Sequence, residues 1–87
     1  LTKTVSKYEG EIVCVVANKT YIFELKNRKA ITLPAFWDEA ITEANNYALA
    51  RGLEQTPPAY VIIKRRNAGI EKSWVVQDLE QWLVTRE

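Results

Sequence analysis

Residues 11–26, EIVCVVANKTYIFELK, contain two apolar runs separated by the dipeptide Asn18-Lys19. The first run is rich in β-branched residues and apolar on both faces, which is typical of a central strand covered on both sides. In the second run apolar residues recur at every other position, so that Tyr21, Phe23 and Leu25 share one face. Because Asn tolerates a positive φ, the intervening dipeptide favours a β-hairpin.

A long helix is expected after the hairpin. Pro34 suits the first helical position, and no Gly or Pro interrupts residues 35–51. Arg51 lies in the expected last turn, and Gly52 follows as a helix-terminating residue. The apolar residues that recur on one face of this helix are Trp37, Ala40, Ile41, Ala44, Tyr47 and Ala48.

The C-terminal third predicts one further strand and one further helix. Residues 59–64 form an apolar strand after a pair of prolines. We favour a short strand at 73–76 followed by a helix from 77 to 85, and the alternative is one helix that starts at Ser73. The side chains expected to point inward from this helix are Leu79, Trp82 and Leu83.

These elements predict a single α+β domain that spans residues 1–87. Its small, mostly antiparallel sheet, made of the N-terminal hairpin and a later strand, packs against two helices in the order β-β-(β)-α-β-α. Residues 3–8 and 29–33 are candidates for additional edge strands.

Composition argues against most catalytic and metal-binding chemistry. The 87-residue chain has no His and one Cys, so a zinc site, an internal disulfide and a Ser/His or Cys/His arrangement are all excluded. Cys14 lies in an apolar run and is expected to be buried, and the lack of disulfides favours a cytoplasmic location. Glu39 and Glu43 share a helix face, but exposed helices carry such pairs routinely. We therefore expect no catalytic residues, no metal, no cofactor and no membrane contact.

Two dense groups of basic residues follow the strands expected at 20–26 and 59–64. If both strand ends lie at one edge of the sheet, the cations could neutralise phosphates and Asn could bind bases or backbone. The residues predicted to contact nucleic acid are Lys26, Arg28, Lys29, Lys64, Arg65, Arg66 and Asn67. The alternative is a solvated rim that keeps a small domain in solution.

The tripeptide Glu24-Leu25-Lys26 has Glu-x-Lys spacing on an expected strand. This pattern resembles the core motif of the PD-(D/E)xK nucleases over three residues. The resemblance implies a metal ligand at Glu24 and a catalytic cation at Lys26. The upstream Asp of that family is absent, and the available acidic residues are Glu9 and Glu11. The favoured interpretation is an ordinary exposed pair on a strand.

Large aromatic residues offer a different kind of function. Any of them that remain exposed would form a patch for a protein partner or a second copy of the chain. A half-exposed edge strand at 20–26 would serve the same purpose. The aromatic residues considered are Phe36, Trp37, Tyr60, Trp74 and Trp82.

We therefore expect a small non-catalytic binding or regulatory module whose basic rim contacts nucleic-acid phosphates. The alternative is a protein-interaction module or homodimer built on exposed aromatics and an open sheet edge. A third alternative is a small metal-dependent nuclease that uses Glu24 and Lys26. Added salt weakens phosphate contacts but leaves apolar association intact, which separates the first two.

Overall fold

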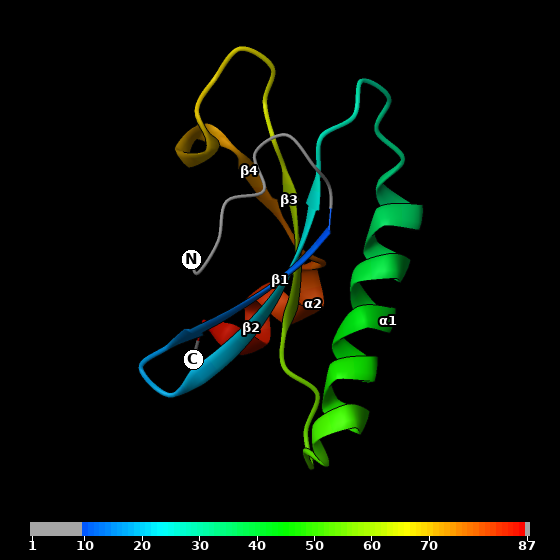
Figure 1. The fold of residues 1–87 in the computed structure, drawn as a ribbon, viewed down its shortest axis with the longest axis vertical. Helices are drawn as coiled ribbons and strands as arrows, with labels where there is room; N and C mark the ends of the chain where they lie inside the picture. The colour runs from blue at the N-terminus through cyan, green and yellow to red at the C-terminus, as the bar shows by residue number, and fades with distance from the viewer. Residues whose placement is uncertain (1–9, 87) are drawn as a thin grey trace.

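The computed structural model describes residues 10–86, which form a four-stranded sheet and two α-helices (Figure 1). The strands are β1 (Gly10–Val16), β2 (Lys19–Lys26), β3 (Ala59–Ile63) and β4 (Trp74–Val76), and the helices are α1 (Leu33–Arg51) and α2 (Leu79–Thr85). The strands are ordered β1-β2-β3-β4, and a 3-10 turn at Ile70–Lys72 precedes β4. The predicted α+β class is confirmed, and residues 73–76 contribute a strand rather than the start of a helix.

β1 and β2 form the predicted hairpin, with Val16 opposite Lys19. The turn residues are Ala17 and Asn18, with φ angles of 52° and 66°. Positive φ at both central positions is the geometry of a type I′ turn, whose twist matches that of paired strands. The turn therefore starts one residue before the predicted dipeptide, and Asn18 supplies the left-handed conformation expected of it.

α1 connects β2 to β3 as a crossover, and the β2–β3 pairing is consequently parallel. The helix begins beside Pro34 and ends at Gly52, where φ is 63° and the N–H donates to the carbonyls of the last turn. Since β2 and β3 run in the same direction, their carboxyl ends meet at one edge of the sheet. The N–H of Lys64 donates to the Lys26 carbonyl there, at 3.0 Å.

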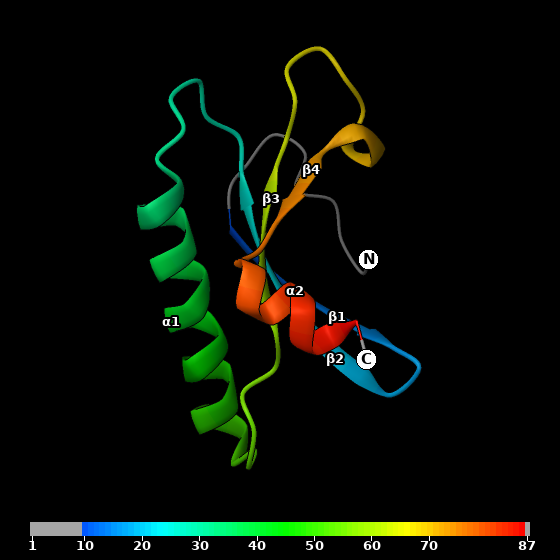
Figure 2. The same ribbon diagram turned by 180° about the vertical axis from the view of Figure 1, so that it is seen from behind.

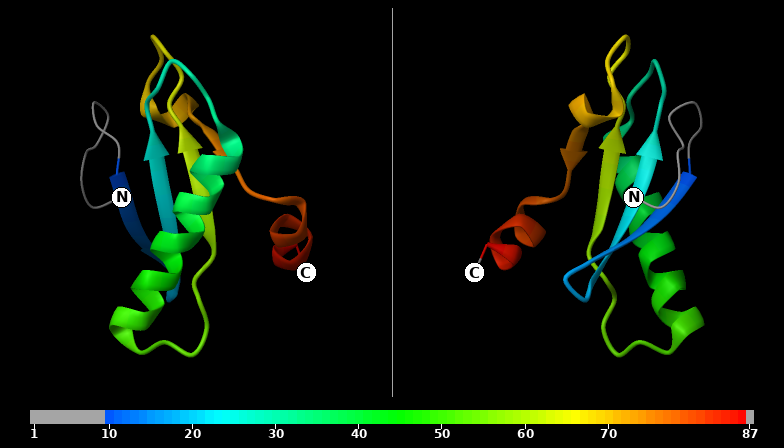
Figure 3. Two further views of the ribbon diagram at one scale, coloured as in Figure 1. Left: turned by 90° about the vertical axis from the view of Figure 1, so that its right-hand side faces the viewer. Right: turned by 60° about the vertical axis from the view of Figure 1, so that its left-hand side comes forward.

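The core lies between α1 and the sheet face formed mainly by β2 and β3 (Figure 3, left). Small side chains on α1 allow the helix to lie close to the strands. The buried residues of this core are Ile22, Phe36, Ala40, Ala44, Ala59, Val61 and Ile63. The remaining stripe residues Trp37, Ile41 and Tyr47 are partly buried at its border.

α2 lies at the β4 edge of the sheet rather than on the face that α1 covers (Figures 2 and 3). Asp78 caps it by accepting a hydrogen bond from the Gln81 N–H at 2.7 Å, and Gln81 Nε2 donates to the Ala59 carbonyl at 2.8 Å. The prediction that Leu79, Trp82 and Leu83 point inward is wrong, because all three are exposed. A seven-residue helix beside a three-residue strand finds little sheet surface to cover. Neither α-helix of residues 10–86 could cross a membrane, since neither is both long and apolar enough.

Four further expectations need correction. β1 is an edge strand of the described sheet rather than a central one, because the α1 crossover places β3 on the other side of β2. For the same reason β2, considered as a half-exposed edge strand at 20–26, is central and offers no open edge. Cys14 is a half-buried free thiol, since it faces away from α1. Residues 29–33 form no strand and instead lead into α1. The candidate strand at 3–8 lies outside the described residues.

Candidate functional site

β2 ends in a buried pair of opposite charges. Glu24 and Lys26 are 2% and 1% exposed, and the Lys26 ammonium lies 3.2 Å from Glu24 Oε2. Alternation along the strand puts both side chains on the α1 side of the sheet, in line with the core residue Ile22. The interpretation of this motif as an ordinary exposed pair is therefore wrong, because α1 covers this part of β2.

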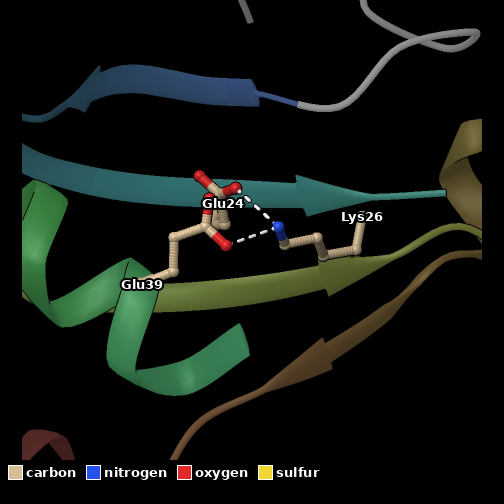
Figure 4. Close-up of polar contacts among 3 residues, drawn as sticks. All are labelled: Glu24, Lys26 and Glu39. Carbon is tan, nitrogen blue, oxygen red and sulfur yellow. Dashed lines mark hydrogen bonds and ion pairs between the residues drawn. The ribbon is translucent and has the colours of Figure 1, made fainter. Parts of the chain in front are cut away.

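Glu39, on the second turn of α1, completes an ion-pair cluster with this pair (Figure 4). The Lys26 ammonium donates to Glu39 Oε1 at 2.6 Å. Burial alone would lower the pKa of Lys26, but the hydrogen bonds to Glu39 and Glu24 outweigh it and raise that pKa. The hydrogen bond from Lys26 lowers the pKa of Glu39. Lys26 and Glu39 are thus both charged at neutral pH.

Glu43 brings a third carboxylate to the cluster from the next turn of α1. Oxygens of Glu24, Glu39 and Glu43 all lie within 4.8 Å of one another. Burial, followed by the hydrogen bond and charge of Glu24, raises the pKa of Glu43 to about 8. Glu43 is therefore mostly protonated at neutral pH when no cation offsets the neighbouring negative charge.

A fourth acidic residue, Glu11 on β1, lies beside this group. Glu11 is the direct cross-strand partner of Glu24, so the two side chains share the α1 face of the sheet. Its charge contributes to the raised pKa of Glu43. Glu11 thus supplies an acidic residue upstream of the Glu-x-Lys motif and in register with it, whereas Glu9 lies outside the described residues.

Two oxygens of the cluster have no donor apart from the proton that Glu43 holds at neutral pH. They are Oε1 of Glu24, whose side chain is almost completely buried, and Oε1 of Glu43. When Glu43 is ionised both are unsatisfied, and an unsatisfied buried acceptor costs about 1–3 kcal/mol, and more when it is charged. A bound cation would satisfy both oxygens at once.

The donor set fits a hard divalent cation. All the candidate ligands are carboxylate oxygens, which Mg²⁺, Mn²⁺ and Ca²⁺ prefer. Metal–oxygen distances of about 2.0–2.6 Å let one ion bridge oxygens with this spread. When fully ionised, the three carboxylates and the Lys26 ammonium carry a formal charge of −2, which a divalent cation neutralises.

The basic residues predicted to bind nucleic acid gather at the same edge of the sheet, with two exceptions. A hollow of about 370 Å³ beyond the ends of β2 and β3 is lined by Arg28, Lys29, Ile31, Ile63, Lys64, Arg65, Arg66 and Trp74. Lys26 is not part of this surface, because it is buried in the carboxylate cluster. Asn67 is exposed in the neighbouring turn with φ of 59° and does not line the hollow.

The cations that line this hollow, Arg28, Lys29, Lys64, Arg65 and Arg66, form the basic rim. Lys64 has a structural role within this rim. Its ammonium donates to the carbonyls of Arg65 and Ala68, at 3.1 and 2.6 Å. These bonds hold the turn that follows β3 in a closed shape. Arg65 and Arg66 remain exposed on that turn.

Sequence reasoning missed the participation of Glu39 and Glu43 in the site. Each immediately precedes a fully buried alanine of α1, Ala40 and Ala44. That position at the border of the buried stripe was the available signal, because it puts a carboxylate beside the sheet rather than in open solvent. Ile31 was also missed, and Trp74 was considered only for a protein-binding patch, whereas both line the basic hollow.

Comparison with known proteins identifies no relative. No family model matches the chain, and no curated protein and no solved structure matches it either. The functional argument therefore rests on the geometry of the carboxylate cluster and the basic rim.

Proposed function

We propose that this protein is a divalent-cation-dependent hydrolase of phosphodiester bonds in nucleic acid. The observation that carries the proposal is the buried Glu24–Lys26 pair, which converges with two helix carboxylates and leaves two oxygens without partners once Glu43 is ionised. The resemblance of Glu24-Leu25-Lys26 to the PD-(D/E)xK motif supports the same chemistry. This proposal gives the third alternative of the sequence analysis more weight than the non-catalytic binding module.

The residues of the cluster divide the work between holding a cation and stabilising charge. Glu24, Glu39 and Glu43 would hold the ion, which when bound supplies Lewis-acid polarisation of a phosphate and a water of lowered pKa. Lys26, whose buried ammonium lies between Glu24 and Glu39, would supply positive charge near a phosphate on which negative charge develops. Glu39 keeps the Lys26 ammonium charged and oriented through its 2.6 Å hydrogen bond.

The basic rim would hold the nucleic acid next to the cluster. Five cations line its hollow, and the rim begins where β2 and β3 end, directly after Lys26. Such cations neutralise backbone phosphates and make binding strongly dependent on salt. The non-catalytic binding module uses the same rim without chemistry, so cleavage is the measurement that separates the two proposals.

The test is cleavage of labelled single-stranded and duplex oligonucleotides in Mg²⁺, in Mn²⁺ and in EDTA. We expect cleavage with either cation, none in EDTA, and a loss of at least about 100-fold in Glu24→Gln. Glu54→Gln, an exposed carboxylate in the loop after α1, is the matched control and should retain activity. Absence of cleavage by the wild-type protein, or full activity of Glu24→Gln, would overturn the proposal.

A second candidate function, protein association, is favoured by a separate apolar surface. A hollow of about 310 Å³ on the sheet face opposite α1 is lined by Cys14, Val16, Tyr21, Phe23, Tyr60 and Val75. Leu79 and Leu83 on α2 are exposed as well. Sedimentation velocity across a concentration series tests self-association, which Val75→Ser in the hollow should weaken. A monomer at all concentrations would leave only a different protein as partner.

A further inference from the structure

Trp74 occupies a defined position relative to the carboxylate cluster. In the sheet register, Lys26 on β2 is paired with Ile63 on β3, and Ile63 is paired with Trp74 on β4. Directly paired residues point to the same face of a sheet, so Lys26 and Trp74 lie on the same face, two strands apart. Two strand spacings separate the backbones by about 10 Å.

The indole of Trp74 is available on that face. α1 packs mainly over β2 and β3, and Trp74 on β4 is 53% exposed. The Arg65 guanidinium lies 5.4 Å from the Trp74 ring, and Ile31, 48% exposed, lines the same hollow. The hollow therefore combines an aromatic surface, an apolar wall and phosphate-binding cations within reach of the site.

We propose that this hollow binds an unpaired nucleotide next to the scissile phosphate, with its base stacked on Trp74. The preferred substrate class is then single-stranded or locally unpaired nucleic acid. This inference rests on the proposed nucleic-acid function. It deepens that function, because the cations alone bind any phosphate backbone without regard to strandedness.

The chemistry of stacking explains the preference. In a duplex both faces of each base are covered by neighbouring bases, whereas an unpaired base offers a free face to an aromatic side chain. Arginine planes also stack on bases, so Arg65 can remain over the ring or cover the second face of the base. Lys29 and Arg66, which line the same hollow, are placed for the flanking phosphates.

The fold offers a matched control for Trp74. Trp82 on α2 is 44% exposed and has the Arg86 guanidinium 5.3 Å from its ring, but it does not line the basic hollow. The two tryptophans thus have similar exposure and a similar arginine neighbour. They differ in whether they stand beside the rim and the carboxylate cluster.

The experiment is fluorescence anisotropy with a labelled oligo-dT strand and a duplex of equal length, in EDTA so that cleavage cannot interfere. We expect Trp74→Ala to weaken single-strand binding about 10-fold, Trp74→Phe to restore most of it, and duplex binding to change little. Trp82→Ala should leave both affinities unchanged. Circular dichroism of each variant checks that the fold is retained.

Three outcomes would overturn the inference. Equal weakening of single-strand and duplex binding by Trp74→Ala would show that the ring only supports the rim. Unchanged single-strand binding would show that no base stacks there, and would leave phosphate binding by the rim intact. Absence of any oligonucleotide binding at low salt would remove the rim as well. Cleavage is tested separately by activity with Mg²⁺, so failure of the cleavage proposal and failure of this inference are distinguishable.

Discussion

The surface between β2 and α1 contains two regions of opposite chemistry, and in both of them the β2 side chains are buried. In the middle, Ile22 packs against Ala44 and the rest of an apolar core. At the carboxyl end of the same strand, Glu24 and Lys26 take the next two positions on that face and meet Glu39 of the same helix. One strand and one helix thus build first a hydrophobic core and then a charged cluster.

The difference between these two regions separates stability from function. Burial of apolar surface stabilises a fold by roughly 25 cal/mol per Å². Removing charges from water costs several kcal/mol per ion, and an ion pair recovers this only when its remaining groups are satisfied. When Glu43 is ionised, the cluster leaves two carboxylate oxygens without partners. Under the proposed function, a bound cation rather than stability accounts for these charges.

The largest effect should follow from removing the charge of Lys26 while keeping its shape. We expect Lys26→Met to reduce Mg²⁺-dependent cleavage about 100- to 1,000-fold, because the group that stabilises developing charge is lost. Binding of Mn²⁺ should persist, since the carboxylates remain. Kinetics of the variant, with the exposed Lys19→Met at the opposite end of β2 as the control, measure this. Unchanged cleavage by Lys26→Met would remove Lys26 from the reaction.

An intermediate effect, on stability alone, is expected from a substitution in the apolar core. Ile22→Val removes one methylene from a fully buried side chain, so the free energy of unfolding should fall by about 0.5–1.5 kcal/mol. Cleavage at a temperature well below unfolding should be retained. Urea denaturation together with the cleavage assay checks both. Loss of cleavage without loss of stability would contradict the division between the two regions.

The smallest effect is a pH dependence of stability that originates at Glu43. Its pKa is raised from 4.5 to about 8 in the folded protein, so the folded state holds this proton more tightly than the unfolded state. This contribution to stability is complete below pH 4.5 and is lost as the pH rises through about 8. Glu43→Gln should therefore raise the free energy of unfolding at pH 8, by about 1 kcal/mol or less for this partly exposed group, and have little effect at pH 4.

The measurement is thermal unfolding of wild-type and Glu43→Gln proteins between pH 4 and pH 9. Glu54→Gln serves again as the control. If the melting temperatures of wild type and Glu43→Gln differ by the same amount at all pH values, Glu43 does not have the raised pKa assigned to it. The same proton predicts that divalent cations bind more tightly at pH 8 than at pH 6, because binding must displace it.

Local patterns predicted most of the secondary structure. The hairpin was indicated by its alternation and by Asn18, and α1 by Pro34 at its start and Gly52 at its end. The position of β1 at the sheet edge could not be read from its apolar run. It depends on which side of β2 receives β3, and the α1 crossover decides that.

The candidate site was predicted only in fragments. Glu24 and Lys26 stood out by their spacing, and the rim by its density of cations. Their burial depended on where α1 lies over β2, and the recruitment of Glu39 and Glu43 depended on the rotation of that helix. Long-range packing of this kind leaves no short motif in the sequence.

The most direct test of the proposed cation site is a titration with Mn²⁺ followed by electron paramagnetic resonance, which detects the free ion. We predict saturable binding by the wild-type protein and marked weakening in both Glu24→Gln and Glu39→Gln, with Glu54→Gln unchanged. Wild-type protein that leaves Mn²⁺ free at millimolar concentrations, or binding unaffected by the two cluster variants, would contradict a metal site at this cluster.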